Sequence, residues 1–230
     1  MRFRIYRLTR HLRRLVSEIG NKENPDDYLK NISGVIHIGA NLGQERTLYN
    51  HYGLRVLWIE PIPEIFEKLQ KNVKNFKYQR ALCELITDID SQEYEFHIAN
   101  NDGQSSSILD FKQHKEVWPN IAFTRSIHLQ STTLTTLIKE KGIVLKDYQM
   151  LSMDTQGSEL LILRGCRSIV KNFRYIQTEA SDFEPYEGGC QLREIEEFMT
   201  EEGFSEMVRS ELATHDSGGK HYDVVYQRHS

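Results

Sequence analysis

Glycine and acidic residues at the ends of apolar segments form the pattern in this sequence with the clearest chemical meaning. Gly39 and Gly43 follow one apolar segment, so the backbone there can approach a ligand closely and the next helix can offer free N–H groups. Glu60 ends the following apolar segment, 21 residues after Gly39. A carboxylate at that distance suits a ribose diol, because it accepts hydrogen bonds from both hydroxyl groups.

The spacing of the glycines narrows the class of ligand. Gln44 stands where a dinucleotide-binding fold has its third glycine, which disfavours a nicotinamide cofactor and hence an NAD-dependent enzyme. The sequence has no Gly-x-x-x-x-Gly-Lys-Ser/Thr segment, which disfavours a nucleoside triphosphate. A ribose ligand without a pyrophosphate fits best, and S-adenosylmethionine is the obvious one.

Two further acidic residues end later strands of the predicted sheet and are candidates for catalysis. Asp154 could contact the ammonium group of the ligand, take a proton from a substrate hydroxyl, or hold a metal. The alternative is structural, since Asp154 or Ser158 could cap the next helix. Glu179 is the second candidate base, and its alternative is a solvated strand end. Two acids at one crevice would make base chemistry plausible.

The histidines and cysteines give a weaker signal. None of the nine histidines shows metal-ligand spacing, and we predict no dedicated metal site. His37 lies inside the first strand, on the face opposite Ile36 and Ile38, where it is either a satisfied structural histidine or a group on the floor of the crevice. The three cysteines are odd in number and far apart, which indicates a reducing compartment, and we predict a cytoplasmic protein.

An alternation of strands and helices must position these residues. It predicts a mostly parallel sheet with right-handed crossovers. The predicted strands cover residues 34–39, 55–60, 76–82, 149–154 and 175–179, with helices over 43–51, 63–73, 133–141, 158–170 and 191–202. Residues 204–209 and 221–227 should close the sheet as an antiparallel pair. After the third strand we predict a hairpin insertion, 85–87 against 94–98, and a turn-rich loop over 100–107 of the kind that often lies over a binding crevice.

Charge divides the 230 residues unevenly. Residues 1–22 hold seven basic residues and one acid around a helical apolar stripe, and the rest of the chain carries a formal charge of −10. Such an acidic body disfavours nucleic acid as a partner. We therefore predict a basic amphipathic helix and linker over 1–30 and one domain over 31–230. For the helix we rank self-docking or contact with a second copy first, recruitment of substrate second and a membrane surface third.

Several segments together resemble the FkbM family of S-adenosylmethionine-dependent methyltransferases. The most specific is 151–160, which is similar to the family's Asp-x-x-Gly-x-Glu segment, followed by 163–166. The other matching segments are 35–43, 58–61, 81–82, 105–107, 179–181, 203–204 and 222–226. The resemblance implies a class I methyltransferase fold of the Rossmann-like α/β type. Its sheet would have seven mostly parallel strands, with the last strand antiparallel.

The resemblance also implies roles for individual residues. The methionine part of the cofactor would be surrounded by Gly39, Ala40, Asn41 and Gly43. Glu60, with Pro61 beside it, would bind the ribose, and Ala81 and Leu82 would lie near the adenine. His37 stands where the family usually has an acid, and it can still accept a hydrogen bond. Ser106 and Gln156 are the candidates for contact with substrate.

These inferences lead to one expected function and two alternatives. We expect a methyltransferase acting on a hydroxyl of a sugar, glycan or natural product, with Asp154 or Glu179 removing the proton. The alternatives are an N-methyltransferase acting on a peptide and a non-catalytic Rossmann-like scaffold.

Overall fold

The computed structural model describes residues 26–215 and 218–229, and the chain divides into the compact units 1–32 and 33–230. The described part of the first unit is a 3-10 helix over Asp27–Asn31 and the residue on either side of it. The basic helix predicted over residues 1–22 lies outside the described residues. The second unit holds every predicted site residue.

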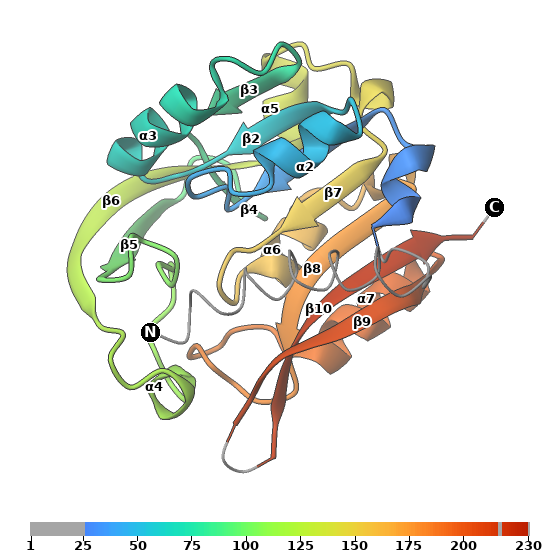
Figure 1. Cartoon of the computed structure of the whole chain (residues 1–230). Coiled ribbons are helices and arrows are strands. Elements are labelled where there is room, and N and C mark those ends of the chain that lie inside the picture. The colour runs from blue at the N-terminus through green and yellow to red at the C-terminus, as the bar shows by residue number, and fades with distance from the viewer. Residues whose placement is uncertain (1–25, 216–217, 230) are drawn as a thin grey trace, which may run out of the picture. The chain divides into compact units, whose positions relative to one another are not determined.

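A seven-stranded sheet in the order β3-β2-β1-β7-β8-β10-β9 forms the centre of the second unit (Figure 1). Its strands are β1 (Gly34–Ile38), β2 (Arg55–Ile59), β3 (Gln79–Leu82), β7 (Met150–Met153), β8 (Tyr175–Ser181), β9 (Phe204–Thr214) and β10 (Lys220–Arg228). The first five strands along the chain pair in parallel, and β10 is antiparallel to both of its neighbours. This confirms the predicted class I methyltransferase architecture.

The strand order places a topological switch at β1. The chain runs from β1 outwards through β2 to β3 and then returns to β7 on the other side of β1. Ligands of open α/β sheets bind beyond the carboxyl ends of the strands at such a point. The segments that follow β1, β2, β7 and β8 therefore define where the site must lie.

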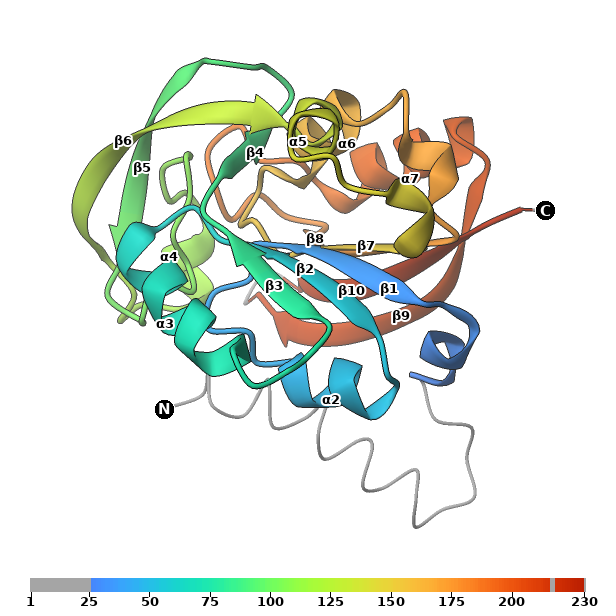
Figure 2. The same cartoon turned by 90° about the horizontal axis from the view of Figure 1, so that it is seen from above.

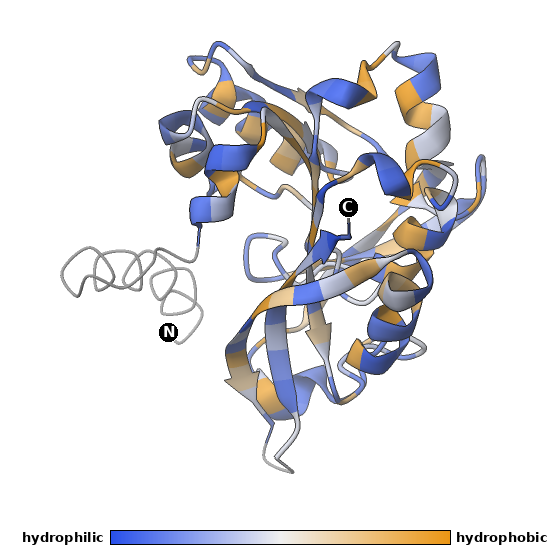
Figure 3. Cartoon of the chain, turned by 90° about the vertical axis from the view of Figure 1, so that its right-hand side faces the viewer, coloured by the Kyte–Doolittle hydropathy of each residue, from blue (hydrophilic) through white to orange (hydrophobic). Residues whose placement is uncertain are grey.

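Helices cover both faces of the sheet (Figure 2). One face carries α5 (Leu134–Glu140), α6 (Glu159–Gly165) and α7 (Leu192–Glu201), and the other carries α2 (Arg46–His51) and α3 (Pro63–Val73). Hydrophobic and hydrophilic residues alternate along these helices (Figure 3), as expected where one side of a helix is buried. In α7 the buried residues are Leu192, Ile195, Phe198 and Met199.

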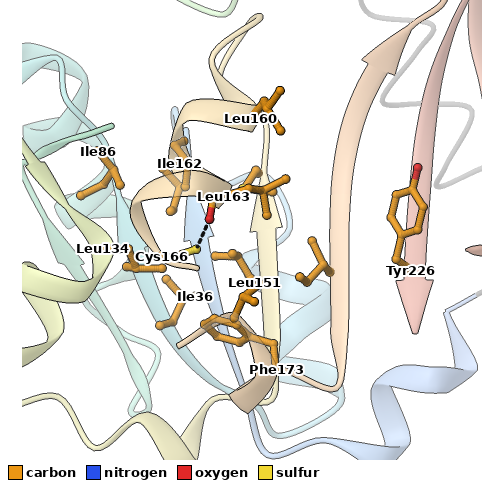
Figure 4. Close-up of a cluster of buried hydrophobic side chains, with 14 of the residues drawn as sticks. Ile36, Ile86, Leu134, Leu151, Leu160, Ile162, Leu163, Cys166, Phe173 and Tyr226 are labelled. Carbon is orange, nitrogen blue, oxygen red and sulfur yellow. Dashed lines mark hydrogen bonds between the residues drawn. The ribbon is translucent and has the colours of Figure 1, made fainter. Parts of the chain in front are cut away.

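The main core lies between the sheet and α5, α6 and α7. Ile36 of β1 and Leu151 of β7 pack there against Leu160 and Leu163 of α6 (Figure 4). Cys166 belongs to the same cluster, and its thiol donates to the Leu163 carbonyl at 3.5 Å. Burial raises the pKa of this thiol to about 12, which makes Cys166 an unreactive packing residue.

Helix α2 begins three residues later than predicted. The prediction started it at Gly43, but the described helix starts at Arg46. Asn41 and Gly43 have positive φ angles of 45° and 67°, so the chain is still turning at these two residues. The segment between β1 and α2 is therefore a longer turn than expected.

The insertion after β3 exists, but its predicted pairing is wrong. It contains β4 (Leu85–Thr87), β5 (Glu93–Ala99) and β6 (Phe123–Thr133) in the order β4-β6-β5, with the single-turn helix α4 (His114–Val117) before β6. Strands β4 and β5 do not pair with each other. Both pair with β6, β4 in parallel and β5 antiparallel, because the longer β6 offers a free edge on each side.

Candidate active site

The turn after β1 lies directly against the end of β7. The amides of Gly39 and Ala40 donate to the Ile59 carbonyl at 3.0 and 3.1 Å, which ties the turn to β2 as well. Gly39 has a φ of +76°, and a Cβ at this position would lie 1.9 Å from the Asp154 carbonyl oxygen. Only glycine fits there, so the predicted glycine turn and Asp154 meet at the switch point.

Glu60 connects the end of β2 to the same turn. Its carboxylate is buried and accepts the Asn41 amide at 2.7 Å and the Ile62 amide at 3.0 Å. Burial raises the pKa of Glu60 to about 7, although the two amide hydrogen bonds act to lower it. Each carboxylate oxygen has two lone pairs, so both can accept one further hydrogen bond. The contact with a ribose stays a prediction.

The residues predicted near the adenine lie beside Glu60. Ala81 and Leu82 end β3 opposite Trp58 and Ile59, and the Leu82 carbonyl accepts the Glu60 amide at 3.1 Å. Pro61 follows Glu60, and its carbonyl accepts the Cys83 thiol at 3.7 Å. The structure thus brings the predicted cofactor residues of β2 and β3 together at one edge of the sheet.

Two polar atoms beside the glycine turn are buried without a hydrogen-bond partner among the described residues. They are Gln44 Oε1 and Thr155 Oγ1. The Gln44 amide nitrogen donates to Asn41 Oδ1 at 2.8 Å, and the Thr155 methyl group lies 3.3 Å from the ideal Cβ position of Gly39. Buried polar groups are normally hydrogen-bonded, so an unpaired acceptor and an unpaired hydroxyl at this turn fit a polar ligand.

His37 lies in an aromatic cluster beneath α2. It is buried, its Nδ1 lies 3.2 Å from the Tyr49 hydroxyl, and its ring centroid lies 4.9 Å from that of Trp58. Ile36 and Ile38 face the opposite core, which confirms the predicted division of the strand. These contacts favour the structural alternative for His37, and its contact with a cofactor stays a prediction.

Gln156 bridges the two sides of the site. Its amide nitrogen donates to Asp154 Oδ1 at 2.5 Å, and its carbonyl oxygen accepts the Tyr186 hydroxyl at 2.7 Å. Gln156 itself has a positive φ of 59°. The side chain predicted to contact substrate therefore joins the acid after β7 to a tyrosine that follows β8.

Glu159 closes the segment between β7 and α6. Its buried carboxylate accepts the amides of Thr155 and Gly157 at 2.8 and 3.0 Å, and the Cys190 thiol donates to it at 3.4 Å. Burial raises the pKa of Glu159. Ser158, at the N-cap of α6, makes no capping hydrogen bond with its side chain. Glu159 thus holds the turn that precedes α6, Ser158 does not cap the helix with its side chain, and the capping role of Asp154 stays a prediction.

The loop over residues 100–107 contacts both sides of the site. The Asp102 carbonyl accepts the Asn41 side chain at 2.9 Å, and the Ser107 hydroxyl donates to the Gln156 carbonyl at 2.8 Å. The Ser106 hydroxyl accepts the Ala99 amide at 3.0 Å, so its described contact lies within the insertion. Contact of Ser106 with substrate stays a prediction.

A partly open pocket lies at the carboxyl end of β8. It is lined by Trp118, Gln156, Gly157, Glu159, Glu179, Ala180, Ser181, Pro185, Tyr186, Gly189, Cys190 and His221. Of the two candidate bases, Glu179 lines this pocket, whereas Asp154 is not among the lining residues and its backbone carbonyl adjoins Gly39. The two acids therefore lie in different surroundings.

Sequence reasoning missed the three aromatic side chains of this pocket. Trp118 comes from a segment that carried no predicted element, Tyr186 from the loop after β8, and His221 from the closing strand. His114, behind Trp118 and Tyr186, is buried, and burial lowers its pKa to about 3, so it stays neutral.

The described ranges lack two features. No helix within them is both long enough and apolar enough to span a bilayer. No group of three or more His, Cys, Asp or Glu side chains in the same ranges is arranged to hold a metal ion.

The fold and the arrangement of strand ends are those of a class I methyltransferase. Residues 37–206 match the family model described as the methyltransferase FkbM domain, and the chain belongs to this family. It is 28% identical over 169 residues to the 2-O-methyltransferase NoeI of Sinorhizobium fredii, a match that covers 70% of this chain and 68% of that protein.

Solved structures support the fold alone. The magnesium protoporphyrin IX methyltransferase of Synechocystis PCC 6803, a structure with bound S-adenosylmethionine, is similar with a TM-score of 0.54 at 8% identity. That match covers 99% of this chain and 82% of the other. The METTL16 methyltransferase domain is similar with a TM-score of 0.53 at 12% identity, and 89% of this chain spans 65% of that one.

Proposed function

We propose that this FkbM-family methyltransferase transfers a methyl group from S-adenosylmethionine to a hydroxyl group of a sugar, glycan or related natural product. One observation carries the proposal. The glycine turn, with Glu60 bonded to it, lies on one side of Asp154 and Gln156, and the open pocket with Glu179 lies on the other. The expected methyl-donor site and the expected acceptor site are thus adjacent, with Asp154 and Gln156 between them.

The residues at the turn fit S-adenosylmethionine. Glu60 would accept hydrogen bonds from the ribose hydroxyls, and the backbone from Gly39 to Gly43 would surround the methionine part. The unpaired oxygen atoms of Gln44 and Thr155 can accept from and donate to the polar groups of such a ligand. When bound, the cofactor supplies an electrophilic methyl group on a sulfonium.

The pocket favours an oxygen acceptor that has both apolar and polar faces. Trp118 and Tyr186 offer aromatic surface, and Gln156 and Glu179 offer hydrogen-bonding groups, a combination suited to a sugar ring. Glu179 would take the proton from the reacting hydroxyl as the new oxygen–carbon bond forms. The name of the relative NoeI, a 2-O-methyltransferase, supports oxygen over nitrogen as the acceptor atom.

A panel of acceptors tests the proposal. The full chain would be incubated with S-adenosylmethionine and separate methyl glycosides, hydroxylated aromatic compounds and peptides, and the products weighed by mass spectrometry. We expect the mass of a glycoside to increase by that of one CH₂ group and the masses of the peptides to stay unchanged. Methylation of peptides alone would show an N-methyltransferase. Calorimetry with S-adenosylhomocysteine is the control, because a chain that fails to bind it would be a scaffold.

A further inference from the structure

A chain of three polar side chains links β8 and β10 at the pocket. His221 Nε2 lies 3.0 Å from Glu179 Oε2, and His221 Nδ1 lies 2.7 Å from Ser181 Oγ. Ser181 is the register partner of His221, and Glu179 lies two residues earlier on the same face of β8. All three residues line the pocket. Of the three, only Glu179 was predicted from the sequence to have a catalytic role.

The chemistry of the outer groups fixes the direction of both hydrogen bonds. An ionised carboxylate only accepts, so in the neutral imidazole the ring proton of His221 sits at Nε2 and points to Glu179. Nδ1 then has a lone pair, and the Ser181 hydroxyl, which can donate, fills it. Glu179 thereby selects the tautomer, and Ser181 satisfies Nδ1 and fixes the orientation of the ring.

The surroundings of these three side chains partly shield their hydrogen bonds from water. The side chain of His221 is 16% exposed and that of Glu179 is 27% exposed, so solvent reaches the carboxylate from the pocket side only in part. Trp118 lies edge-on to the His221 ring, with centroids 5.8 Å apart. The imidazole is thus held between the indole, the serine and the carboxylate.

We propose that His221 is a positioning residue for methyl transfer. It holds the Glu179 carboxylate toward the acceptor hydroxyl, and Ser181 fixes the orientation of its ring. The inference rests on the proposed function. In the step, the acceptor O–H bond breaks and an O–CH₃ bond forms, while the electron pair of the S–CH₃ bond stays on sulfur. The proton passes to Glu179, and His221 donates to Oε2 before and after the transfer.

Substitutions at His221 separate positioning from folding. His221→Leu removes the donor and should lower kcat roughly tenfold or more, with KM, affinity for S-adenosylhomocysteine and melting temperature nearly unchanged. His221→Gln keeps an N–H group that can reach Glu179, so it should restore a large part of kcat. His128→Leu is the matched control, since His128 faces Glu93 at 3.6 Å on the insertion, away from the pocket.

A second measurement does not need an acceptor. Long-range ¹H–¹⁵N spectra of the full ¹⁵N-labelled chain, assigned with the His221→Gln variant, report which ring nitrogen carries the proton. We expect the Nε2–H tautomer at neutral pH, lost or mixed in Glu179→Ala.

Two results would overturn the inference: an Nδ1–H tautomer, or a His221→Leu enzyme with the kcat of the wild type. If no glycoside or other alcohol is methylated, the proposed function fails, whereas the tautomer still decides whether the three side chains form the chain described here.

Discussion

The backbone of Gly39 and the carbonyl oxygen of Asp154 are in such close contact that no side chain fits between them. A Cβ on residue 39 would lie 1.9 Å from that oxygen. The contact joins β1 to β7 at the switch point, where the donor and acceptor sides of the site meet. Several measurable consequences arise from this arrangement and from the groups around it.

Gly39→Ala should both destabilise the fold and abolish binding of S-adenosylhomocysteine. The substitution adds a steric clash to a positive φ, so we expect a loss of more than about 2 kcal/mol in the free energy of unfolding. Gly53→Ala is the control, because Gly53 has a φ of +68° with nothing within 4 Å of its ideal Cβ. Equal melting temperatures for the two variants would contradict the contact.

Glu60 should make stability depend on pH in an unusual direction. Burial raises its pKa from 4.5 to about 7, so the folded chain binds this proton more tightly than the unfolded chain. The stabilisation is complete below pH 4.5 and is lost as the pH rises through about 7, a change on the order of 3 kcal/mol. Chemical denaturation at several pH values would measure it.

Glu60→Gln is the comparison for that experiment. It removes the titration, so the unfolding free energy of the wild type, minus that of the variant, should fall as the pH rises through this window. A difference independent of pH would argue against a raised pKa. The same variant should bind S-adenosylhomocysteine more weakly, by about 1.5–3 kcal/mol, because a hydrogen bond to a charged group is lost.

The two candidate bases should respond differently to removal of their charge. Glu179→Gln should lower kcat about a hundredfold or more while leaving affinity for S-adenosylhomocysteine intact, because Glu179 lines the acceptor pocket. Asp154→Asn should act chiefly on cofactor affinity, because Asp154 adjoins the glycine turn. The reverse pattern, measured by steady-state kinetics and calorimetry, would make Asp154 the base.

Tyr186→Phe should loosen the loop over residues 100–107. The Tyr186 hydroxyl donates to the Ser105 carbonyl at 3.2 Å and to Gln156 Oε1 at 2.7 Å, and we expect a cost of about 1 kcal/mol. Amide hydrogen exchange in 100–107 should become faster. Tyr226→Phe is the matched control, since the buried Tyr226 hydroxyl has no hydrogen-bond partner among the described residues and its removal should be neutral or stabilising.

The basic segment at the start of the chain gives a prediction from sequence alone. Deletion of residues 1–22 should reduce oligomer size or thermal stability and leave binding of S-adenosylhomocysteine unchanged, because attraction to the acidic body requires no lipid. Light scattering and thermal melts measure this. Unchanged results, together with lost binding to anionic liposomes, would place the segment at a membrane instead.

The central sheet was predictable because its strands are apolar runs that end in glycine or acid, as residues 34–39 and 55–60 do. The pairing within the insertion was not, since β4 has only three residues and no strand was predicted over the residues of β6. Periodicity identifies a strand without identifying its partner. A length of three residues also gives too little pattern to set a register.

The site, too, has residues that the sequence predicts and residues that it does not. Residues at strand ends, such as Gly39, Glu60 and Glu179, follow from the topology of a parallel sheet. Trp118 and His221 could not be anticipated, because they come from segments about a hundred residues apart in the sequence and meet only through tertiary packing. The surroundings of His37 depend in the same manner on two rings from other elements.

The loop over residues 100–107 holds Asn41 at one end and Gln156 at the other. A ligand that orders either end therefore lowers the entropic cost of ordering the loop for a ligand at the other end. By linkage this coupling is reciprocal. Donor and acceptor should consequently bind with positive cooperativity, and the dissociation constant of each should fall when the other is present at saturation.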